Sequence, residues 1–321
     1  MIVKSFEKSL DLLQEEALNR RIHPHHPRRN EIATRFRQSL AGYLGEKEVF
    51  YYLTLLPKKK YRIFHNLRLR LDHNYFQVDF LILTSKYILI LEVKNYQGTV
   101  LFKEFDQLVQ VKESGKEEVF PNPISQVFRH KFLLQRWFDQ IGFPIIPMAS
   151  LVAFTSATRI ENQALSPELS KHIITSPNLL LKLESFDSHY QSKVLNERQL
   201  NQLCKILLDN HHPMQRDILR NYQLDVSDLF KGVLCPHCSY TVMKYNYLNW
   251  ICPKCGFKSS DAHIEALNDY FLLINEAITI KDGLDYLKIS SRKTVKKLLD
   301  KAGYKAIGQT RNRKYILELK Q

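Results

Sequence analysis

The chain has 321 residues, of which 44% are hydrophobic and 25% charged, as is ordinary for a globular protein of about two domains. The 47 Lys and Arg residues outnumber the 33 Asp and Glu residues, and the net charge of +14 favours a polyanionic partner, with nucleic acid ahead of an anionic membrane. No apolar run is long enough to span a membrane, and the charged N-terminal segment predicts no secretory signal.

Cysteine usage indicates the compartment. Four of the five cysteines form two close pairs between residues 235 and 255, which is unlike a disulfide framework distributed through a fold. We therefore expect a reducing cytoplasm.

Residues 1–40 are expected to form a helical N-terminal extension, interrupted at residues 23–29. Three histidines in this interruption, His23, His25 and His26, raise the possibility of a metal site, but the two prolines among them favour an irregular basic linker. A further helix is predicted over residues 43–56, and Pro57 ends it. Its predicted buried stripe is Leu44, Val49, Tyr52, Leu53 and Leu56.

A strand over residues 61–71 leads into an apolar stretch from Asp79 to Lys94 that is typical of two central strands of a sheet. If Ser85 and Lys86 form a two-residue hairpin loop, Asp79 lies opposite Glu92 and the two carboxylates share a face, with Cβ atoms roughly 4.5–5.5 Å apart. A shift of one residue in this register would turn Glu92 to the other face.

Two carboxylates at the rim of an apolar sheet repel each other and require positive charge between them. Lys94 points to the same face as Glu92, but one ammonium cannot neutralise both carboxylates and also fix their geometry. A divalent cation with oxygen ligands can do both. The hairpin is therefore predicted to carry a catalytic cluster of Asp79, Glu92 and Lys94 with a metal ion.

The remainder of this domain is predicted to complete an α/β fold. More strand is expected after Lys94, followed by a polar turn over residues 112–118 and a helix over residues 123–141, on which Gln126 and His130 point the same way. The predicted buried stripe of this helix is Val127, Leu134, Phe138 and Ile141. Strands at residues 150–155 and 172–176 and a helix at 196–210 complete a mixed central sheet flanked by helices on both faces, in a domain spanning residues 41–215.

A zinc ribbon is predicted over residues 230–260. Cys235 and Cys238 form one Cys-x-x-Cys pair and, after thirteen residues, Cys252 and Cys255 form a second, which is the pattern of a tetrahedral zinc site. Redox dithiols are the alternative, but neither pair lies between a strand and a helix. The lone Cys204 is expected to be a small core residue.

Residues 262–321 are predicted to form a nucleic-acid-binding unit like a winged helix, with two short helices followed by a hairpin. From residue 281 onward there are twelve basic and four acidic side chains. A solvated helical face is the alternative explanation for this charge. The residues predicted to contact nucleic acid are Arg292, Lys293, Lys296, Lys297, Arg311, Arg313 and Lys314.

Asp79 followed by Glu92-Val93-Lys94 resembles the PD-(D/E)xK nuclease superfamily. With Gly45-Glu46, residues 64–67, residues 94–98 and Gln126, the sequence is similar to one family within it, the nuclease-related domain or NERD, over roughly residues 40–155. The proline of the superfamily pattern is absent, because Val78 precedes Asp79. The fold that the resemblance implies is restriction-endonuclease-like.

The resemblance also implies roles for individual residues. Asp79, Glu92 and the Val93 carbonyl would hold Mg²⁺ or Mn²⁺, and Glu46 would complete the metal shell directly or through water. Lys94 would orient or activate the attacking water, and Gln126, with His130, would steady Lys94 or the scissile phosphate. The structural alternatives are an ion pair between Asp79 and Lys94, an exposed Glu46, and a Gln126 side chain bonded to its own helix.

These observations predict a metal-dependent DNA endonuclease with accessory DNA-binding modules, requiring Mg²⁺ or Mn²⁺ for catalysis and Zn²⁺ for structure. A non-catalytic DNA-binding regulator built on a nuclease-like scaffold is the first alternative. An RNA-binding or RNA-processing protein is the second, because a zinc ribbon serves RNA as readily as DNA.

Overall fold

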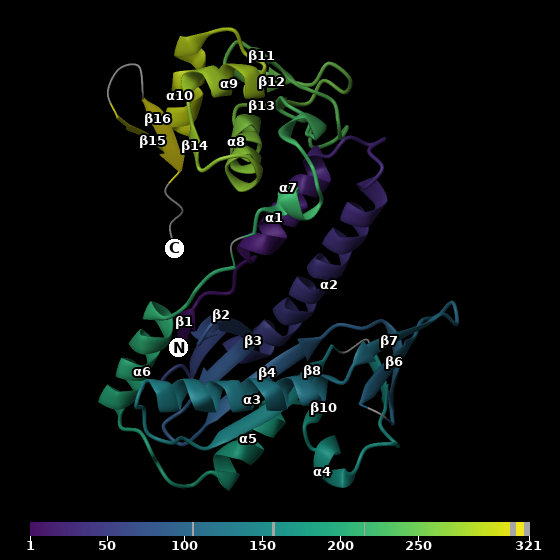
Figure 1. The fold of residues 1–321 in the computed structure, drawn as a ribbon, viewed down its shortest axis with the longest axis vertical. Helices are drawn as coiled ribbons and strands as arrows, with labels where there is room; N and C mark the ends of the chain where they lie inside the picture. Colours follow the sequence, from purple (N-terminus) through teal and green to yellow (C-terminus); the bar gives the residue numbers. More distant parts are fainter. Residues whose placement is uncertain (105, 156–157, 215, 309–312, 318–321) are drawn as a thin grey trace. The chain divides into compact units, whose positions relative to one another are not determined.

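The computed structural model describes residues 1–321 with the exception of 105, 156–157, 215, 309–312 and 318–321. Two compact units account for the chain (Figure 1): unit 1 comprises residues 1–9 and 39–214, and unit 2 comprises residues 10–38 and 215–321. Within the described residues, no helix has the length and apolar character needed to cross a membrane. The bounds of the four domains expected from sequence stay a prediction.

Unit 1 is built on a six-stranded mixed sheet with the strand order β1-β2-β3-β4-β8-β10. Its strands are β1 (Ile2–Lys4), β2 (Arg62–Leu71), β3 (Asn74–Leu83), β4 (Ile88–Lys94), β8 (Met148–Phe154) and β10 (Ile173–Thr175). β2, β3 and β4 are antiparallel, whereas β8 joins β4 in parallel. The predicted mixed α/β sheet is confirmed, with β1 as an additional edge strand that was not predicted.

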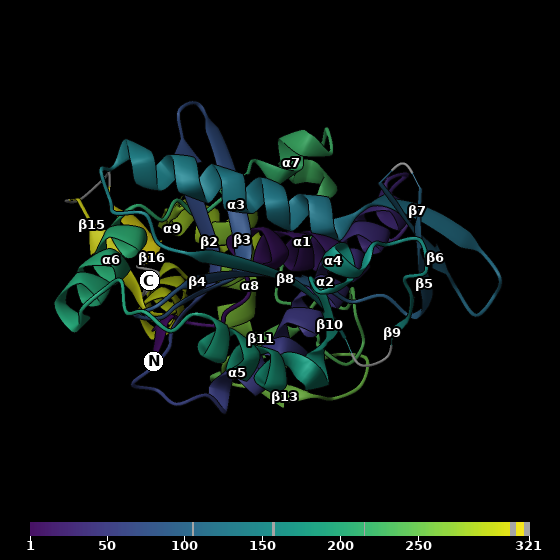
Figure 2. The ribbon, with the colours of Figure 1, turned by 90° about the horizontal axis from the view of Figure 1, so that it is seen from below.

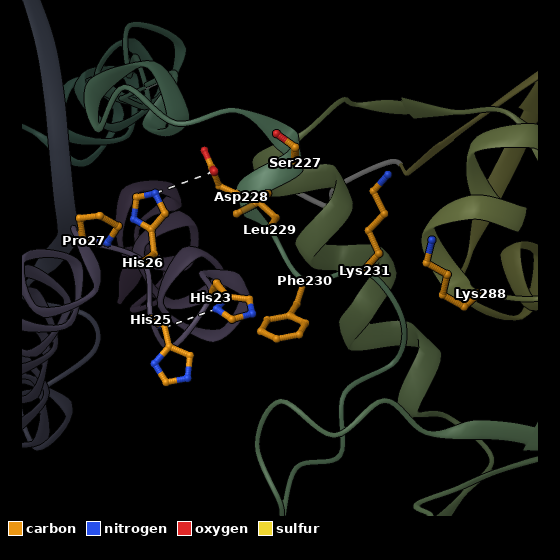
Figure 3. A pocket seen from close by; sticks show the side chains of 10 residues that line it. All are labelled: His23, His25, His26, Pro27, Ser227, Asp228, Leu229, Phe230, Lys231 and Lys288. Carbon is orange, nitrogen blue, oxygen red and sulfur yellow. Dashed lines mark hydrogen bonds and ion pairs between the residues drawn. The ribbon is translucent and has the colours of Figure 1, made fainter.

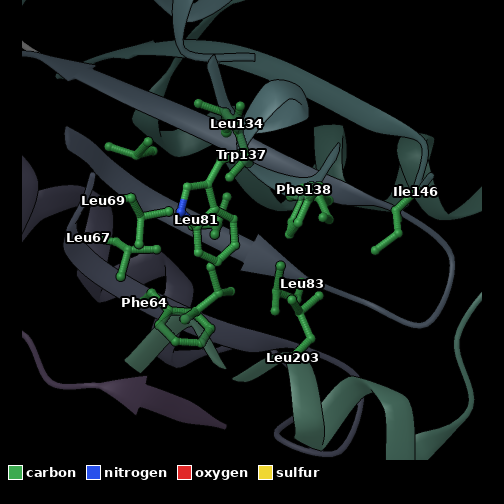
Figure 4. Packing of buried hydrophobic residues seen from close by; sticks show 14 of the residues in the cluster. Phe64, Leu67, Leu69, Leu81, Leu83, Leu134, Trp137, Phe138, Ile146 and Leu203 are labelled. Carbon is green, nitrogen blue, oxygen red and sulfur yellow. The ribbon is translucent and has the colours of Figure 1, made fainter. Parts of the chain in front are cut away.

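Helices cover both faces of this sheet, and Figure 2 shows α3 on one side and α5 on the other. α3 (Pro123–Gln140) and α6 (Glu197–Asp209) pack on the face that bears Leu81 and Ile90. α2 (Arg29–Thr54) and α5 (Leu179–His189) pack on the face that bears Phe80 and Leu91. Figure 4 shows the first of these cores, in which Trp137 and Phe138 of α3 meet Leu81 and Leu83 of β3. Cys204 is buried in the same core, as predicted.

Two residues of the predicted buried stripes are exposed, and those predictions are wrong. Leu44 is 49% exposed because the inward face of α2 follows Gly45, Val49 and Leu53 at intervals of four, which turns Leu44 outward. Ile141 is 38% exposed because it is the residue after the last turn of α3 and no longer follows its inward face.

Gly45 allows α2 to pass close to the end of β4. A Cβ atom added there would lie 2.6 Å from the Cβ atom of Asn95, a distance that real contacts do not reach. Asn95 in turn donates a hydrogen bond from Nδ2 to the Ala41 carbonyl at 2.7 Å. This close approach brings Glu46, the next residue of the helix, to the carboxyl end of β4.

A second sheet, with the order β7-β6-β5-β9, was not predicted as a separate element. It consists of β5 (Gly98–Lys103), β6 (Gln107–Val111), β7 (Glu117–Pro121) and β9 (Thr158–Glu161). Val100 and Phe102 pack against the first turns of α3 and the end of β8. The polar turn expected near residues 112–118 is the connection between β6 and β7.

Unit 2 begins with α1 (Leu10–Arg21), which packs against α8 (Ala262–Leu273). The fully buried Asp269 of α8 accepts hydrogen bonds from Arg20 and Arg21 at 2.6–3.2 Å. This buried ion pair is costly to separate, because removing one partner leaves an uncompensated charge in the core. The helical N-terminal segment is therefore a packed part of unit 2.

The rest of unit 2, as far as the structure describes it, includes the short helix α7 (Ile218–Asn221) and then a small ribbon, which is followed by further helices and strands. The ribbon strands are β11 (Lys244–Asn246), β12 (Asn249–Ile251) and β13 (Lys258–Ser259). After α8 come β14 (Ala277–Ile278), α9 (Ile280–Leu287), α10 (Arg292–Lys301), β15 (Tyr304–Ile307) and β16 (Lys314–Leu317). A Cβ atom added to Gly283 would lie 2.6 Å from Val295 Cγ1, so this glycine permits the close crossing of α9 and α10. The predicted pair of short helices followed by a hairpin is present.

Candidate active site and metal centre

The hairpin β3–β4 has the predicted register. Phe80 pairs with Leu91 and Leu83 with Ile88, and the Thr84 N–H donates to the Tyr87 carbonyl across the Ser85-Lys86 loop at 3.0 Å. Continuing this register places Asp79 opposite Glu92. The Asp79 carboxylate accepts a hydrogen bond from the Val93 N–H at 2.8 Å, which fixes it against the end of β4. Because the N–H and C=O groups of one strand residue point to the same edge, the Val93 carbonyl also points toward Asp79.

Lys94, Glu92 and Gln126 form a closed hydrogen-bonded triangle. Lys94 Nζ donates to Glu92 Oε1 at 2.8 Å and to Gln126 Oε1 at 3.0 Å, while Gln126 Nε2 donates to the same Glu92 oxygen at 2.6 Å. Gln126 therefore bridges the lysine and the carboxylate. Its side chain is not bonded to its own helix, and the ion-pair partner of Lys94 is Glu92.

The second carboxylate oxygen of Glu92 lies outside this triangle. Glu92 is only 3% exposed, and its Oε2 atom is buried without a hydrogen-bond partner. Nδ1 of the buried His130 lies 3.8 Å away and also has no hydrogen-bond partner, and burial lowers the pKa of this histidine, which favours its neutral form. A buried carboxylate oxygen without a partner costs free energy. This oxygen fits a hard divalent cation with oxygen ligands, and Asp79, opposite Glu92 on the neighbouring strand, offers a second carboxylate.

The charges of the site favour a cation as well. Burial, followed by the negative charges of Glu92 and Glu46, raises the pKa of Asp79 well above its ordinary value. Burial lowers the pKa of Lys94, but the carboxylates of Glu92 and Asp79 outweigh this effect and leave the pKa above its ordinary value. Lys94 is thus an ammonium ion at neutral pH, and a metal ion would relieve the repulsion among the acids.

Glu46 is held by a residue that we did not predict as part of the site. Its Oε2 atom lies 2.7 Å from Nε2 of His65 on β2, which is 1% exposed. The His65 ring packs against Phe6 and Phe80, and its carbonyl accepts a hydrogen bond from Lys4. The side chain of His65 shares the sheet face with Phe80, with which it pairs. The sequence signal was its place within residues 64–67, one of the stretches that carry the family resemblance.

The second candidate metal site consists of Cys235, Cys238, Cys252 and Cys255 in unit 2. Their sulfur atoms all lie within 4.8 Å of one another. Burial raises the pKa of the Cys252 thiol, but the N–H groups of Cys255 and Lys254 outweigh this and lower the pKa to about 7. Four convergent thiols from two tight turns fit a structural zinc ion, which they would hold with no open coordination position. The compact cluster is consistent with the predicted zinc ribbon.

The acidic residues are less tightly gathered. Among the residues that the structure describes, the four thiols are the one group of at least three Cys, His, Asp or Glu ligand atoms within 4.8 Å of one another. The carboxylates of Glu46, Asp79 and Glu92 are therefore spread more widely than the thiols.

The three histidines of the N-terminal segment line a hollow of about 720 Å³ in unit 2 together with Asp228, Phe230 and Lys231 (Figure 3). His26 Nε2 lies 3.9 Å from Asp228 Oδ1, and the His23 ring stacks on Phe230. These side chains are not among the groups with convergent metal ligands in the described part of the chain.

The basic residues predicted to contact nucleic acid lie on α10 and the hairpin that follows it. Val295, Leu298 and Leu299 of α10 are buried, whereas the basic residues of the helix face outward. The predicted contacts on α10, Arg292, Lys293, Lys296 and Lys297, are all exposed, and Lys301 is exposed as well but pairs with Asp261. Arg313 and Lys314 are exposed near the turn of the hairpin, and Arg311 lies outside the described residues.

Comparisons with known proteins agree with the sequence resemblance. Residues 41–155 match the sequence profile of the NERD family, the nuclease-related domain. The chain is also similar to an uncharacterized protein of Bacillus anthracis, at 24% identity over 158 residues that cover 49% of this chain and 72% of that protein. No solved structure matches it. The family match spans every acidic residue of the candidate site, together with Lys94 and Gln126.

Proposed function

We propose that the nuclease-related domain at residues 41–155 is the catalytic part of a metal-dependent endonuclease that hydrolyses phosphodiester bonds of DNA. The observation that carries this proposal is the arrangement around Glu92. One of its oxygens is bonded by both Lys94 and Gln126, and the other is buried without a hydrogen-bond partner, while the negative charge of Glu92 helps to raise the pKa of Asp79. A purely structural ion pair would leave the second oxygen buried without a partner, whereas a metal ion would bind it.

Asp79, Glu92 and the Val93 carbonyl would hold Mg²⁺ or Mn²⁺, with Glu46 reaching the ion directly or through water. When bound, the ion lowers the pKa of water and offsets charge that develops on the phosphate. Lys94, being cationic, orients the attacking water and stabilises negative charge on the phosphate oxygens. Gln126 keeps the ammonium group of Lys94 in place by accepting one of its hydrogen bonds.

Unit 2 supplies the DNA-binding part of the proposal. α10 presents exposed basic side chains that include the predicted Arg292, Lys293, Lys296 and Lys297, and the hairpin β15–β16 adds Arg313 and Lys314. A helix of this kind enters the major groove in helix-turn-helix proteins, and basic side chains supply the salt-dependent part of the affinity. We infer that this face binds duplex DNA.

Cleavage of supercoiled plasmid by the zinc-loaded full chain, with Mg²⁺ or Mn²⁺ added, tests the proposal. Cleavage is expected for the wild type and is expected to fall by at least about a hundredfold in Asp79→Ala and Lys94→Ala. Asp72→Ala, which changes an exposed aspartate in the β2–β3 turn, is the matched control and should cleave normally. Cleavage that survives both site substitutions contradicts the proposal, and tight DNA binding without any cleavage favours the regulator.

A further inference from the structure

The hairpin of the ribbon ends in a turn that is unusual in both conformation and composition. β11 pairs with β12 through Asn246 and Asn249, so the loop consists of Tyr247 and Leu248 alone. Both residues have positive φ, 43° and 67°, as a type I′ turn requires. Such turns prefer Asn-Gly, because large side chains are disfavoured in the left-handed region. Here a tyrosine and a leucine occupy both positions.

The two side chains of this turn are also almost fully exposed. Tyr247 is 90% exposed and Leu248 is 72% exposed. Neither is placed there by packing, and each carries a conformational cost that folding does not repay. Strain combined with exposed apolar surface indicates a contact with something outside the chain.

The base of the hairpin, below this tip, is packed and hydrogen-bonded. Tyr245 and Trp250 pair across the strands with ring centroids 5.0 Å apart, and Trp250 is 1% exposed. Trp250 Nε1 donates to Nδ1 of the buried His263 at 3.3 Å. The four thiols lie at the other end of the same ribbon segment. The tip therefore projects from a packed base.

The surface beside the tip is basic. Lys244 pairs with Ile251, which pairs with Lys258, so the three residues lie in a row on one face of the three-stranded sheet. Asn246 and Asn249 share this face, since Asn246 lies two residues after Lys244 and Asn249 two residues before Ile251. Residues 233–260 contain three lysines and no aspartate or glutamate. The face is thus complementary to a polyanion, and a membrane-facing or protein-facing tip does not require such an acid-free surround.

We propose that Tyr247 and Leu248 form a base-contacting tip that stacks against unpaired or unstacked nucleobases, while Lys244 and Lys258 bind the adjoining phosphates. Stacking on an aromatic ring requires access to the flat face of a base, which single strands and distorted duplexes offer and regular duplexes do not. The proposal deepens the proposed function by naming the form of nucleic acid that the ribbon prefers. It predicts that unit 2 binds a junction or single-stranded segment in addition to regular duplex.

The double substitution Tyr247→Asn with Leu248→Gly tests the tip directly. It installs the preferred type I′ pair, so the unfolding temperature should stay the same or rise while the apolar side chains are lost. All proteins carry Asp79→Ala and are zinc-loaded, so the binding result does not depend on whether the wild type cleaves DNA. Affinity for a single-stranded oligonucleotide should fall roughly 5- to 150-fold, and affinity for the matching regular duplex should change little.

Leu181→Asn, which removes an apolar side chain that is 67% exposed in α5, is the control and should bind both nucleic acids normally. A fluorescent adenine analogue in the oligonucleotide should report stacking that the double variant abolishes. Should the double variant lose zinc, Tyr247→Phe and Tyr247→Asn decide instead: retained binding by Phe and reduced binding by Asn support the tip. Unchanged affinity of the double variant for the single-stranded oligonucleotide overturns the proposal. So does a result in which the double variant loses binding to anionic phosphatidylserine vesicles but not to the oligonucleotide.

Discussion

The candidate carboxylate site of unit 1 and the cysteine cluster of unit 2 both contain side chains that metal ions bind, but they gather them in different ways. The four thiols already lie within 4.8 Å of one another, whereas the carboxylates of Glu46, Asp79 and Glu92 are more widely spread. The carboxylate site also contains an ammonium group, Lys94, bonded to one of its proposed ligands. A closed set of four ligands suits an ion that holds structure, and an open set with a built-in cation suits an ion that meets a substrate.

The largest effect is expected when one thiol of the cysteine cluster is removed. In Cys252→Ser we expect loss of zinc and unfolding of the ribbon, because a structural zinc site contributes on the order of 10 kcal/mol to the folding of such segments. Metal analysis and thermal unfolding of the full chain measure both effects. Cys204→Ala changes the thiol in the unit 1 core and should retain its zinc. A Cys252→Ser protein with normal zinc content would refute the closed site.

Loss of the Gln126 amide should impair the open site without unfolding it. Gln126→Leu removes the acceptor for Lys94 and a donor to Glu92, so we expect cleavage to fall on the order of 10- to 100-fold. Gln135→Leu, on the same helix but paired with Asp139, is the control. Equal rates for both variants would show that the triangle has no part in the reaction.

Asp79→Asn tests the charge repulsion of the carboxylate site through the free energy of unfolding. The folded-state pKa of Asp79 is raised, so its contribution to stability is fully present below about pH 4, the unfolded value, and is lost as pH rises through the folded value. Without Mg²⁺ or Mn²⁺, we therefore expect Asp79→Asn to be more stable than the wild type at neutral pH, by about 1 kcal/mol. The difference in stability between Asp79→Asn and the wild type should disappear as pH falls to about 4.

Thermal unfolding between acid and neutral pH measures this difference, with Asp72→Asn as the exposed control. Adding Mn²⁺ should reverse the order, since only the wild type gains stability by binding the ion. An Asp79→Asn protein that is less stable at neutral pH in the absence of the ion would contradict the charge repulsion inferred for the site.

The smallest effect is expected on α10. Lys296→Ala should weaken duplex binding only a few-fold and reduce the slope of log affinity against log salt by about 1, because one phosphate contact is lost. Lys205→Ala, an exposed lysine of α6 paired with Asp209, is the control. Binding titrations over a range of salt give both slopes, and identical slopes would remove α10 from the DNA-binding face.

The register of the β3–β4 hairpin was predictable because an apolar run broken once by Thr-Ser-Lys allows few pairings that bury both strands. The thiols were predictable from their spacing alone. In both cases the determining contacts are local in sequence.

Contacts between distant segments were not predictable in the same way. The bond between His65 and Glu46 depends on how closely α2 crosses the sheet, which Gly45 and Asn95 decide. The edge strand β1 and the packing of α1 on α8 through Asp269 also depend on tertiary pairing. Leu44 was misplaced because the stripe of a helix shifts once small residues such as Gly45 lie on its inward face.

Calorimetric titration of the zinc-loaded full chain with Mn²⁺ tests the central claim most directly. It is carried out on the wild type and on Glu92→Gln. The account predicts Mn²⁺ binding by the wild type that is lost or weakened at least about tenfold in Glu92→Gln, because the buried Glu92 oxygen without a hydrogen-bond partner loses its charge. Mn²⁺ binding of equal strength in both proteins, or none in the wild type at millimolar ion, would contradict it.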